Sequence, residues 1–180
     1  GIALTLEEGA ASRFGYAYRI LAFLLALATI TIGRAMLPAF VRAPHLAMQL
    51  TIRWAPISFT VGLAIALVIG YFAEPVVAVL FERGAFTPED TRAVAGVLQL
   101  GLWQLPPYFA GIVLLQLVMS LRRYELMIVP SIIMVLIKVI GSLVLVRSYG
   151  LDGLMISSAI SYSVMLIVYL YVVGRQLVPE

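Results

Sequence analysis

The sequence contains no cysteine, and only 12% of its 180 residues are charged. The first absence excludes disulfide bonds, cysteine-ligated metal sites and thiol catalysis within this chain. The low fraction of charged residues is not typical of a soluble domain, in which about 25% of residues carry a charge. Histidine is equally scarce, because His45 is the only one.

Apolar residues take the place of the missing charge. They make up 63% of the sequence and give a mean hydropathy of +1.07. A soluble core cannot hide this much apolar surface, whereas helices that cross a bilayer expose it to lipid. We therefore expect an all-α, polytopic membrane helix bundle that forms a single membrane domain over residues 1–180. The net charge of +3 is typical of cytoplasmic loops and gives no reason to expect a nucleic-acid partner.

Long apolar runs separated by prolines, glycines and charged turns predict about five membrane-spanning helices. At about 1.5 Å per residue, each is long enough to cross or nearly cross a hydrocarbon core of about 30 Å. We expect residues 1–14 to form a loop or the tail of a preceding helix, and residues 41–55 an amphipathic connector at the interface. The expected helices cover residues 15–40, 56–81, 88–121, 124–146 and 154–174.

The ends of the chain and its arginines give further expectations. The chain begins with Gly1 and not with methionine, so we expect a fragment or a processed piece, and no signal-peptide pattern is present. Five spans leave five arginines on one side of the membrane and four on the other. This bias favours a cytoplasmic turn at residues 122–123 and an external turn at residues 84–87.

The turn between the second and third expected helices contains residues that favour a chain reversal followed by a helix start. Gly84 can adopt a positive φ and reverse the chain. Thr87 suits an N-cap, and Pro88 suits the first helical position. Glu89 and Asp90 then lie where the helix dipole favours acids. The pattern predicts a helical hairpin whose second helix begins at Pro88.

Two adjacent prolines, Pro106 and Pro107, interrupt the third expected helix near the middle of the membrane. Proline has no N–H group, so two backbone carbonyls lose their partners there. Such a break is tolerated in a membrane only against protein or a water-filled cavity. We interpret these two residues as a hinge.

Four ionisable residues lie inside the expected spans: Arg19, Arg34, Glu74 and Lys138. Each costs about 2.5–3.5 kcal/mol at a helix centre on insertion scales, so each should face the protein interior or a cavity. The plainer alternatives are snorkelling of the arginines to the headgroups, hydration of Glu74, and pairing of Lys138 with a carbonyl or with Glu74. The functional alternative for Glu74 is a cation or proton site. Arg19 and Arg34 lie within about 60° of each other on a helical wheel, so both can line one face.

Three segments resemble a known family. Residues 73–91, AEPVVAVLFERGAFTPEDT, resemble a loop in the C-terminal lobe of MurJ/MviN-type lipid II flippases. These belong to the superfamily of multidrug, oligosaccharidyl-lipid and polysaccharide exporters. Residues 16–20, YAYRI, are similar to the family's Tyr-Ala-x-Arg-Leu segment, and residues 149–154, YGLDGL, to its Tyr-Gly-Val-x-Gly-Leu segment.

The resemblance implies most of one lobe of a flippase that moves lipid II across the bacterial cytoplasmic membrane by alternating access, with no enzymatic reaction and no cofactor. The implied partners are an undecaprenyl-pyrophosphate-linked substrate, membrane lipid and a missing N-terminal lobe of the same protein. In the family, the arginine that matches Arg19 projects into the central cavity and is implicated in holding the anionic substrate. A guanidinium fits pyrophosphate with a fork of donors. Lys138 and Arg34 are expected to help.

The sequence also departs from the family pattern. The turn after the third helix commonly reads Gly-Asp-Thr-Arg-Thr-Pro, of which only Pro130 is clear here, and an asparagine often stands where this chain has Lys138. An exporter of another polysaccharide-lipid or of a small molecule therefore fits these positions equally well, and a cationic cargo would favour Glu74. A membrane-embedded polyprenyl-phosphate glycosyltransferase would need clustered acids or histidines. A scaffold subunit would not need Arg19 or Lys138 at membrane depth.

Overall fold

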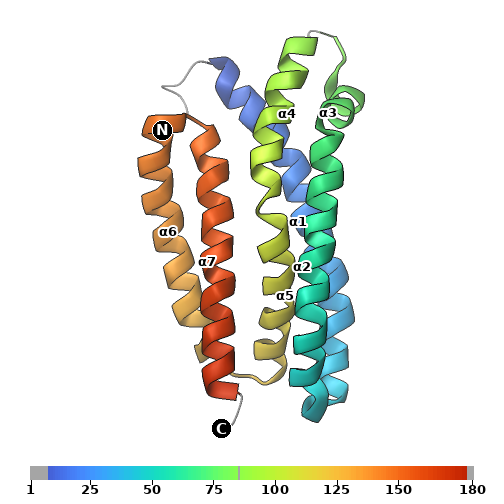
Figure 1. Cartoon of the computed structure of the whole chain (residues 1–180), viewed down its shortest axis with the longest axis vertical. Helices are drawn as coiled ribbons and strands as arrows, with labels where there is room; N and C mark the ends of the chain where they lie inside the picture. The colour runs from blue at the N-terminus through green and yellow to red at the C-terminus, as the bar shows by residue number, and fades with distance from the viewer. Residues whose placement is uncertain (1–7, 85, 178–180) are drawn as a thin grey trace.

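A computed structural model describes residues 8–84 and 86–177, and every regular element within these ranges is a helix (Figure 1). The residues between the helices are few, so the chain turns sharply at each end of the bundle. The elements are α1 (Glu8–Arg42), the short 3-10 helix η2 (Pro44–Leu46), α2 (Ala47–Tyr71), α3 (Ala73–Phe81), α4 (Pro88–Leu102), α5 (Leu105–Ser120), α6 (Glu125–Tyr149) and α7 (Asp152–Leu177).

These helices provide five segments that are long and apolar enough to cross a membrane. This result confirms the all-α membrane bundle that the composition predicts. The segments are Ala11–Arg42, Pro44–Tyr71, Pro88–Ser120, Glu125–Tyr149 and Asp152–Arg175.

The segment formed by α4 and α5 is the centre of the bundle. In its apolar stretch 78% of the residues are buried, against 6% in α6. α1, α2 and α7 all pack against this central segment, whereas α6 packs mainly along α7. Figure 1 shows α6 at one edge of the molecule. The outer face of α6 is therefore free to contact lipid or further protein.

The turns fall at two opposite ends of the bundle (Figure 1). The hairpin between α3 and α4, the start of α1 and the α6–α7 turn lie at one end. The α1–α2 connection, the α5–α6 turn and the end of α7 lie at the other. This alternation is the one expected for five spans, and which end faces the cytoplasm stays a prediction.

The first two spans differ from the expected ranges. α1 begins at Glu8, whereas residues 1–7 of the expected N-terminal loop lie outside the described residues. α2 begins at Ala47, so most of the expected connector is helical and Arg53 lies inside α2. The residues after Ala47 are good helix formers, and one interior proline, Pro56, removes a single ladder hydrogen bond.

The second span is divided at Phe72, where α2 ends and α3 begins. Pro75 cannot donate to the carbonyl one turn earlier, which explains a break at this point. The Gln99 side-chain amide of α4 donates a hydrogen bond of 2.9 Å to the carbonyl of Gly70, just before the break. The interruption is therefore tied to the central segment by a polar contact.

The hairpin after α3 has the predicted caps. Gly84 has φ of 66°, which a residue with a side chain adopts only at a cost. The Thr87 hydroxyl oxygen accepts from the Asp90 amide at 3.2 Å, and the Asp90 carboxylate accepts from the Thr87 amide at 3.1 Å. Together these bonds form a capping box that fixes the start of α4.

Replacing Thr87 with alanine should lower the free energy of unfolding by about 0.5–2 kcal/mol, because the first turn of α4 loses its cap. The measurement is thermal or denaturant unfolding of the full-length protein in detergent. Thr60→Ala, in the middle of α2, is the matched control and should cost less. An equal loss in both variants would contradict a specific role for the cap.

Candidate functional site

Arg19 lies on the exposed side of α1, held over an aromatic ring. Its guanidinium carbon is 5.5 Å from the ring centroid of Tyr16, a cation–π geometry. The Tyr16 ring packs against Phe81 at 4.8 Å and Phe86 at 5.3 Å, both from the hairpin region. The hairpin therefore orients the segment that carries Arg19, and within the described residues the cation–π contact with Tyr16 is the interaction found for its guanidinium.

Arg34 lies nearer the other end of α1 and is also exposed. The neighbouring Gly33 faces α5, where a Cβ atom would come within 3.2 Å of the Gln116 side-chain nitrogen. The structure thus places Arg19 and Arg34 on one helix with both side chains outside the packed core. Neither of them lines the pockets described below.

Lys138 occupies a different place, in a small pocket enclosed by α1, α6, α7 and the junction of α4 with α5. The pocket has a volume of about 140 Å³, and the lysine is half-buried in it. Its other polar lining groups are uncharged side chains: Tyr18, Gln104, Ser142, Ser158 and Tyr162.

A seam of serines joins α6 to α7 beside this pocket. The Ser157 hydroxyl donates to the backbone carbonyl of Lys138 at 3.1 Å, and the Ser142 hydroxyl donates to Ser157 Oγ at 3.3 Å. The Ser158 hydroxyl donates to the Leu154 carbonyl at 2.9 Å. Because Ser142 and Ser158 have used their protons, their oxygens face the pocket as acceptors. Ser157 therefore packs α7 against α6.

A second polar contact extends from the pocket toward α1. The edge of the Tyr162 ring meets the Tyr108 ring at 5.1 Å between centroids. The Tyr108 hydroxyl lies 2.7 Å from Thr29 Oγ1, which itself donates to the Leu25 carbonyl, so Tyr108 is the donor. These tyrosines and Gln104 could not be singled out from the sequence, because a tyrosine in an apolar helix does not show which neighbour it faces.

Glu74 lies in the first turn of α3 and is exposed. It forms no ion pair with Lys138, since the ion pairs found in the described part of the chain are Arg13–Asp90 at 3.8 Å and Arg123–Glu125 at 3.0 Å. The structure therefore separates Glu74 from the lysine that could have paired with it.

Pro106 and Pro107 are buried in the first turn of α5, directly after the break between α4 and α5. In this first turn the missing N–H groups cost no intrahelical hydrogen bond. Gly62 of α2 packs on the break so closely that a Cβ atom there would lie 3.0 Å from the Leu105 carbonyl oxygen. A residue without a side chain is therefore needed at Gly62 for this close contact between helices.

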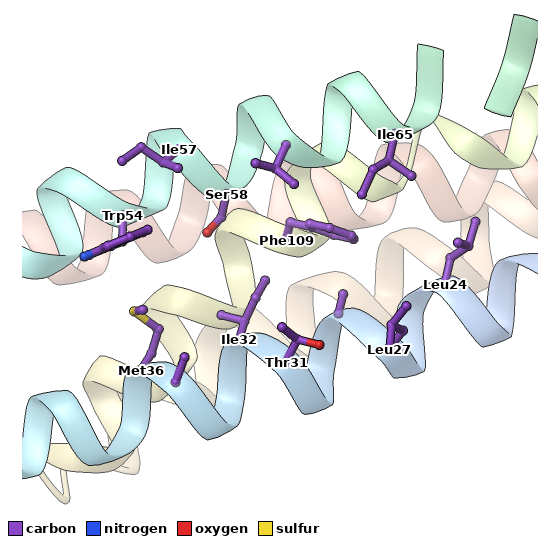
Figure 2. A pocket seen from close by; sticks show the side chains of 13 residues that line it. Leu24, Leu27, Thr31, Ile32, Met36, Trp54, Ile57, Ser58, Ile65 and Phe109 are labelled. Atoms are coloured by element: carbon purple, nitrogen blue, oxygen red, sulfur yellow. The ribbon is translucent and has the colours of Figure 1, made fainter. Parts of the chain in front are cut away.

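An apolar groove of about 370 Å³ lies between α1 and α2 (Figure 2). Phe109 of α5 forms its floor, and Trp54 of α2 lies at one end. The only polar side-chain atoms in the lining are the Thr31 and Ser58 hydroxyls and the indole nitrogen of Trp54. Such a groove suits hydrocarbon and offers no charge to an anionic headgroup. This groove could not be predicted from the sequence, because groove, lipid-facing and core residues are equally apolar.

Comparison with known proteins gives a consistent result. A family model described as lipid II flippase MurJ matches residues 1–179. The chain is 31% identical over 164 residues to a probable lipid II flippase MurJ of Bdellovibrio bacteriovorus, covering 88% of this chain and 31% of that protein. It is 33% identical over 107 residues to one of Rhizobium meliloti, covering 57% of this chain and 20% of that protein.

The fold also matches a solved structure, described as lipid II flippase MurJ in an inward closed conformation. The TM-score is 0.88 at 16% sequence identity, over 96% of this chain and 38% of that one. This chain thus spans about a third or less of the length of the curated relatives it matches.

The Tyr108–Thr29 hydrogen bond should be measurable by a double-mutant cycle of Tyr108→Phe, Thr29→Val and the two together. Hydrogen bonds between membrane helices average about 0.6 kcal/mol and reach about 1.7 kcal/mol, so we expect a coupling energy in this range. The measurement is the unfolding free energy of the full-length protein in detergent. Fully additive single effects would show that this bond does not hold α1 to α5.

Proposed function

The chain belongs to the lipid II flippase MurJ family, and we propose that it forms part of a flippase that carries lipid II across the bacterial cytoplasmic membrane by alternating access. The observation that carries the proposal is the family match over residues 1–179, which runs through all five spans. The protein is then a multi-pass transporter and not an enzyme. The remainder of the polypeptide would supply the N-terminal lobe and close the cavity.

In this proposal Arg19 binds the pyrophosphate of the undecaprenyl-linked substrate. Its guanidinium is exposed and its ring partner, Tyr16, is fixed by Phe81 and Phe86, so the charge is positioned before substrate arrives. A guanidinium offers two parallel N–H donors to phosphate oxygens, and such charge-assisted bonds are stronger than neutral ones. Arg34, exposed on the same helix, adds a second positive charge along the path of the headgroup.

We leave Lys138 out of the substrate contacts, because it lines a separate pocket whose volume of about 140 Å³ is too small for a glycosylated headgroup. Glu74 is exposed in α3, beyond the Pro44–Tyr71 segment and not inside a span as the sequence predicted, and its hydration accounts for the charge. A cation or proton site at Glu74 would be proposed only for a cationic cargo.

The central segment would provide the moving part. Its break at residues 103–104 lies directly before Pro106 and Pro107, and helix breaks are positions where a span can bend without losing further hydrogen bonds. The headgroup would enter from the cytoplasmic side, the lobes would rock, and the headgroup would leave outside while the polyprenyl tail stayed in lipid.

The other candidate functions receive no support from the relatives reported above, which are described as lipid II flippases. Neither an exporter of a different polysaccharide-lipid nor a polyprenyl-phosphate glycosyltransferase is therefore proposed.

The test is growth of bacteria depleted of their own lipid II flippase and supplied with the full-length protein. We expect wild-type protein to restore growth and Arg19→Ala to fail, with both confirmed in the membrane. Loss of a charge-assisted hydrogen bond of about 1.5–3 kcal/mol should lower the transport rate at least roughly tenfold.

Arg147→Ala is the matched control, because Arg147 is an exposed arginine at the end of α6 and should be dispensable. Rescue by Arg19→Ala as well would remove Arg19 from the mechanism. Failure of well-expressed wild-type protein would contradict lipid II as the substrate.

A further inference from the structure

α6 is the least buried of the five membrane-spanning segments. It packs along α7 through the serine seam and makes little contact with the other helices. The Lys138 pocket lies where α6 approaches α1, and both sides of this region carry exposed apolar side chains. On α6, Val135 shares the face of Lys138 and is 57% exposed, and on α1 Tyr18 is 52% exposed. The pocket therefore lies within a larger apolar surface that nothing in the described chain covers.

The charge in this pocket is not balanced. Lys138 is the one charged side chain among the pocket residues, and no carboxylate of the described chain forms an ion pair with it. The neighbouring hydroxyl oxygens of Ser142 and Ser158 can accept hydrogen bonds from an ammonium group, because their own protons are directed elsewhere. These neutral oxygens supply no negative charge, and an unpaired charge at membrane depth is costly.

Three features indicate the chemistry of the missing partner. It must be anionic to match the ammonium, small to fit about 140 Å³, and surrounded by apolar surface to cover the exposed side chains of α1 and α6. A membrane-spanning helix with a single acidic side chain has all three properties. The relatives are about three times as long as this chain, so further helices of the same protein are available.

We propose that Lys138 forms an intramembrane ion pair with an aspartate or glutamate on a membrane-spanning helix outside residues 1–180 of the same protein, and that this helix seats between α1 and α6. The inference goes beyond the proposed function, because it assigns Lys138 to the assembly of the bundle and not to the substrate. It also accounts for a pocket that contains acceptor oxygens around a cation.

The first experiment maps the neighbour of Lys138 by crosslinking in the full-length protein freed of native cysteines. Lys138→Cys is combined in turn with cysteine at each aspartate or glutamate in the spans outside this chain. A bifunctional thiol reagent is used, because a direct disulfide requires Cβ atoms about 3.5–4.5 Å apart, closer than the ends of a lysine–acid pair. We expect one acidic position to crosslink strongly.

Two matched controls make the result decisive. Ser142→Cys with Ser157→Cys should crosslink, because the two hydroxyl oxygens are 3.3 Å apart. Ile140→Cys, on the opposite side of α6 and 59% exposed, should not crosslink to the same acidic position. If the serine pair crosslinks and no acidic position does, the proposal is wrong. Equal crosslinking from Ile140→Cys would also overturn it.

A charge exchange provides the second readout. Lys138→Asp and the acid→Lys variant should each lower the melting temperature, and the double variant should regain most of the loss, since the pair is restored with opposite polarity. No recovery in the double variant would contradict an ion pair. If the melting temperature of the wild-type protein is higher in chloride than in gluconate, and this difference is lost when Lys138 is replaced, the pocket binds a mobile anion and the proposal is wrong. Neither readout depends on lipid II transport, so failure here leaves the flippase proposal standing.

Discussion

The absence of water from the hydrocarbon core governs this structure, because every backbone polar group and charge in the membrane must find its partner within the protein. The two interrupted spans show how this requirement is met. The break at Phe72 is tied to α4 through the Gln99–Gly70 hydrogen bond, and the break before Pro106 is covered by Gly62 of α2. Both breaks involve the central segment of α4 and α5, which is also the most buried part of the chain.

The same requirement separates the charges of the chain into two groups. Arg19 and Arg34 lie on the outer side of α1, where a substrate or a second lobe can reach them. Lys138 lies between helices, beside the Ser142 and Ser158 hydroxyl groups, whose protons are already used. Cations that look alike in sequence therefore have different surroundings. On this difference rest our proposals that the arginines bind a ligand and that the lysine pairs with another helix.

Much of the fold could be predicted from the sequence. Apolar runs located the five spans, and Gly84, Thr87 and Asp90 predicted the hairpin, because these signals depend on nearby residues. The start of α2 could not be placed, since Pro56 was interpreted as a helix start although a long helix tolerates one interior proline. The site was harder to predict. The charged residues could be identified in the sequence, but their neighbours could not. Lys138 shares a pocket with Tyr18, Gln104 and Tyr162 because of which helices pack side by side, and apolar periodicity does not predict this packing.

The most direct test of the central claim is a translocation assay with the purified full-length protein in liposomes that contain fluorescent lipid II in both leaflets. A membrane-impermeant reagent bleaches the outer leaflet, and we expect the inner pool to become accessible only when the protein is present. Fluorescent phosphatidylglycerol, an anionic lipid without the disaccharide headgroup, should stay protected in the same liposomes. If folded, correctly inserted protein leaves the inner lipid II pool protected, the proposal that it moves lipid II is wrong.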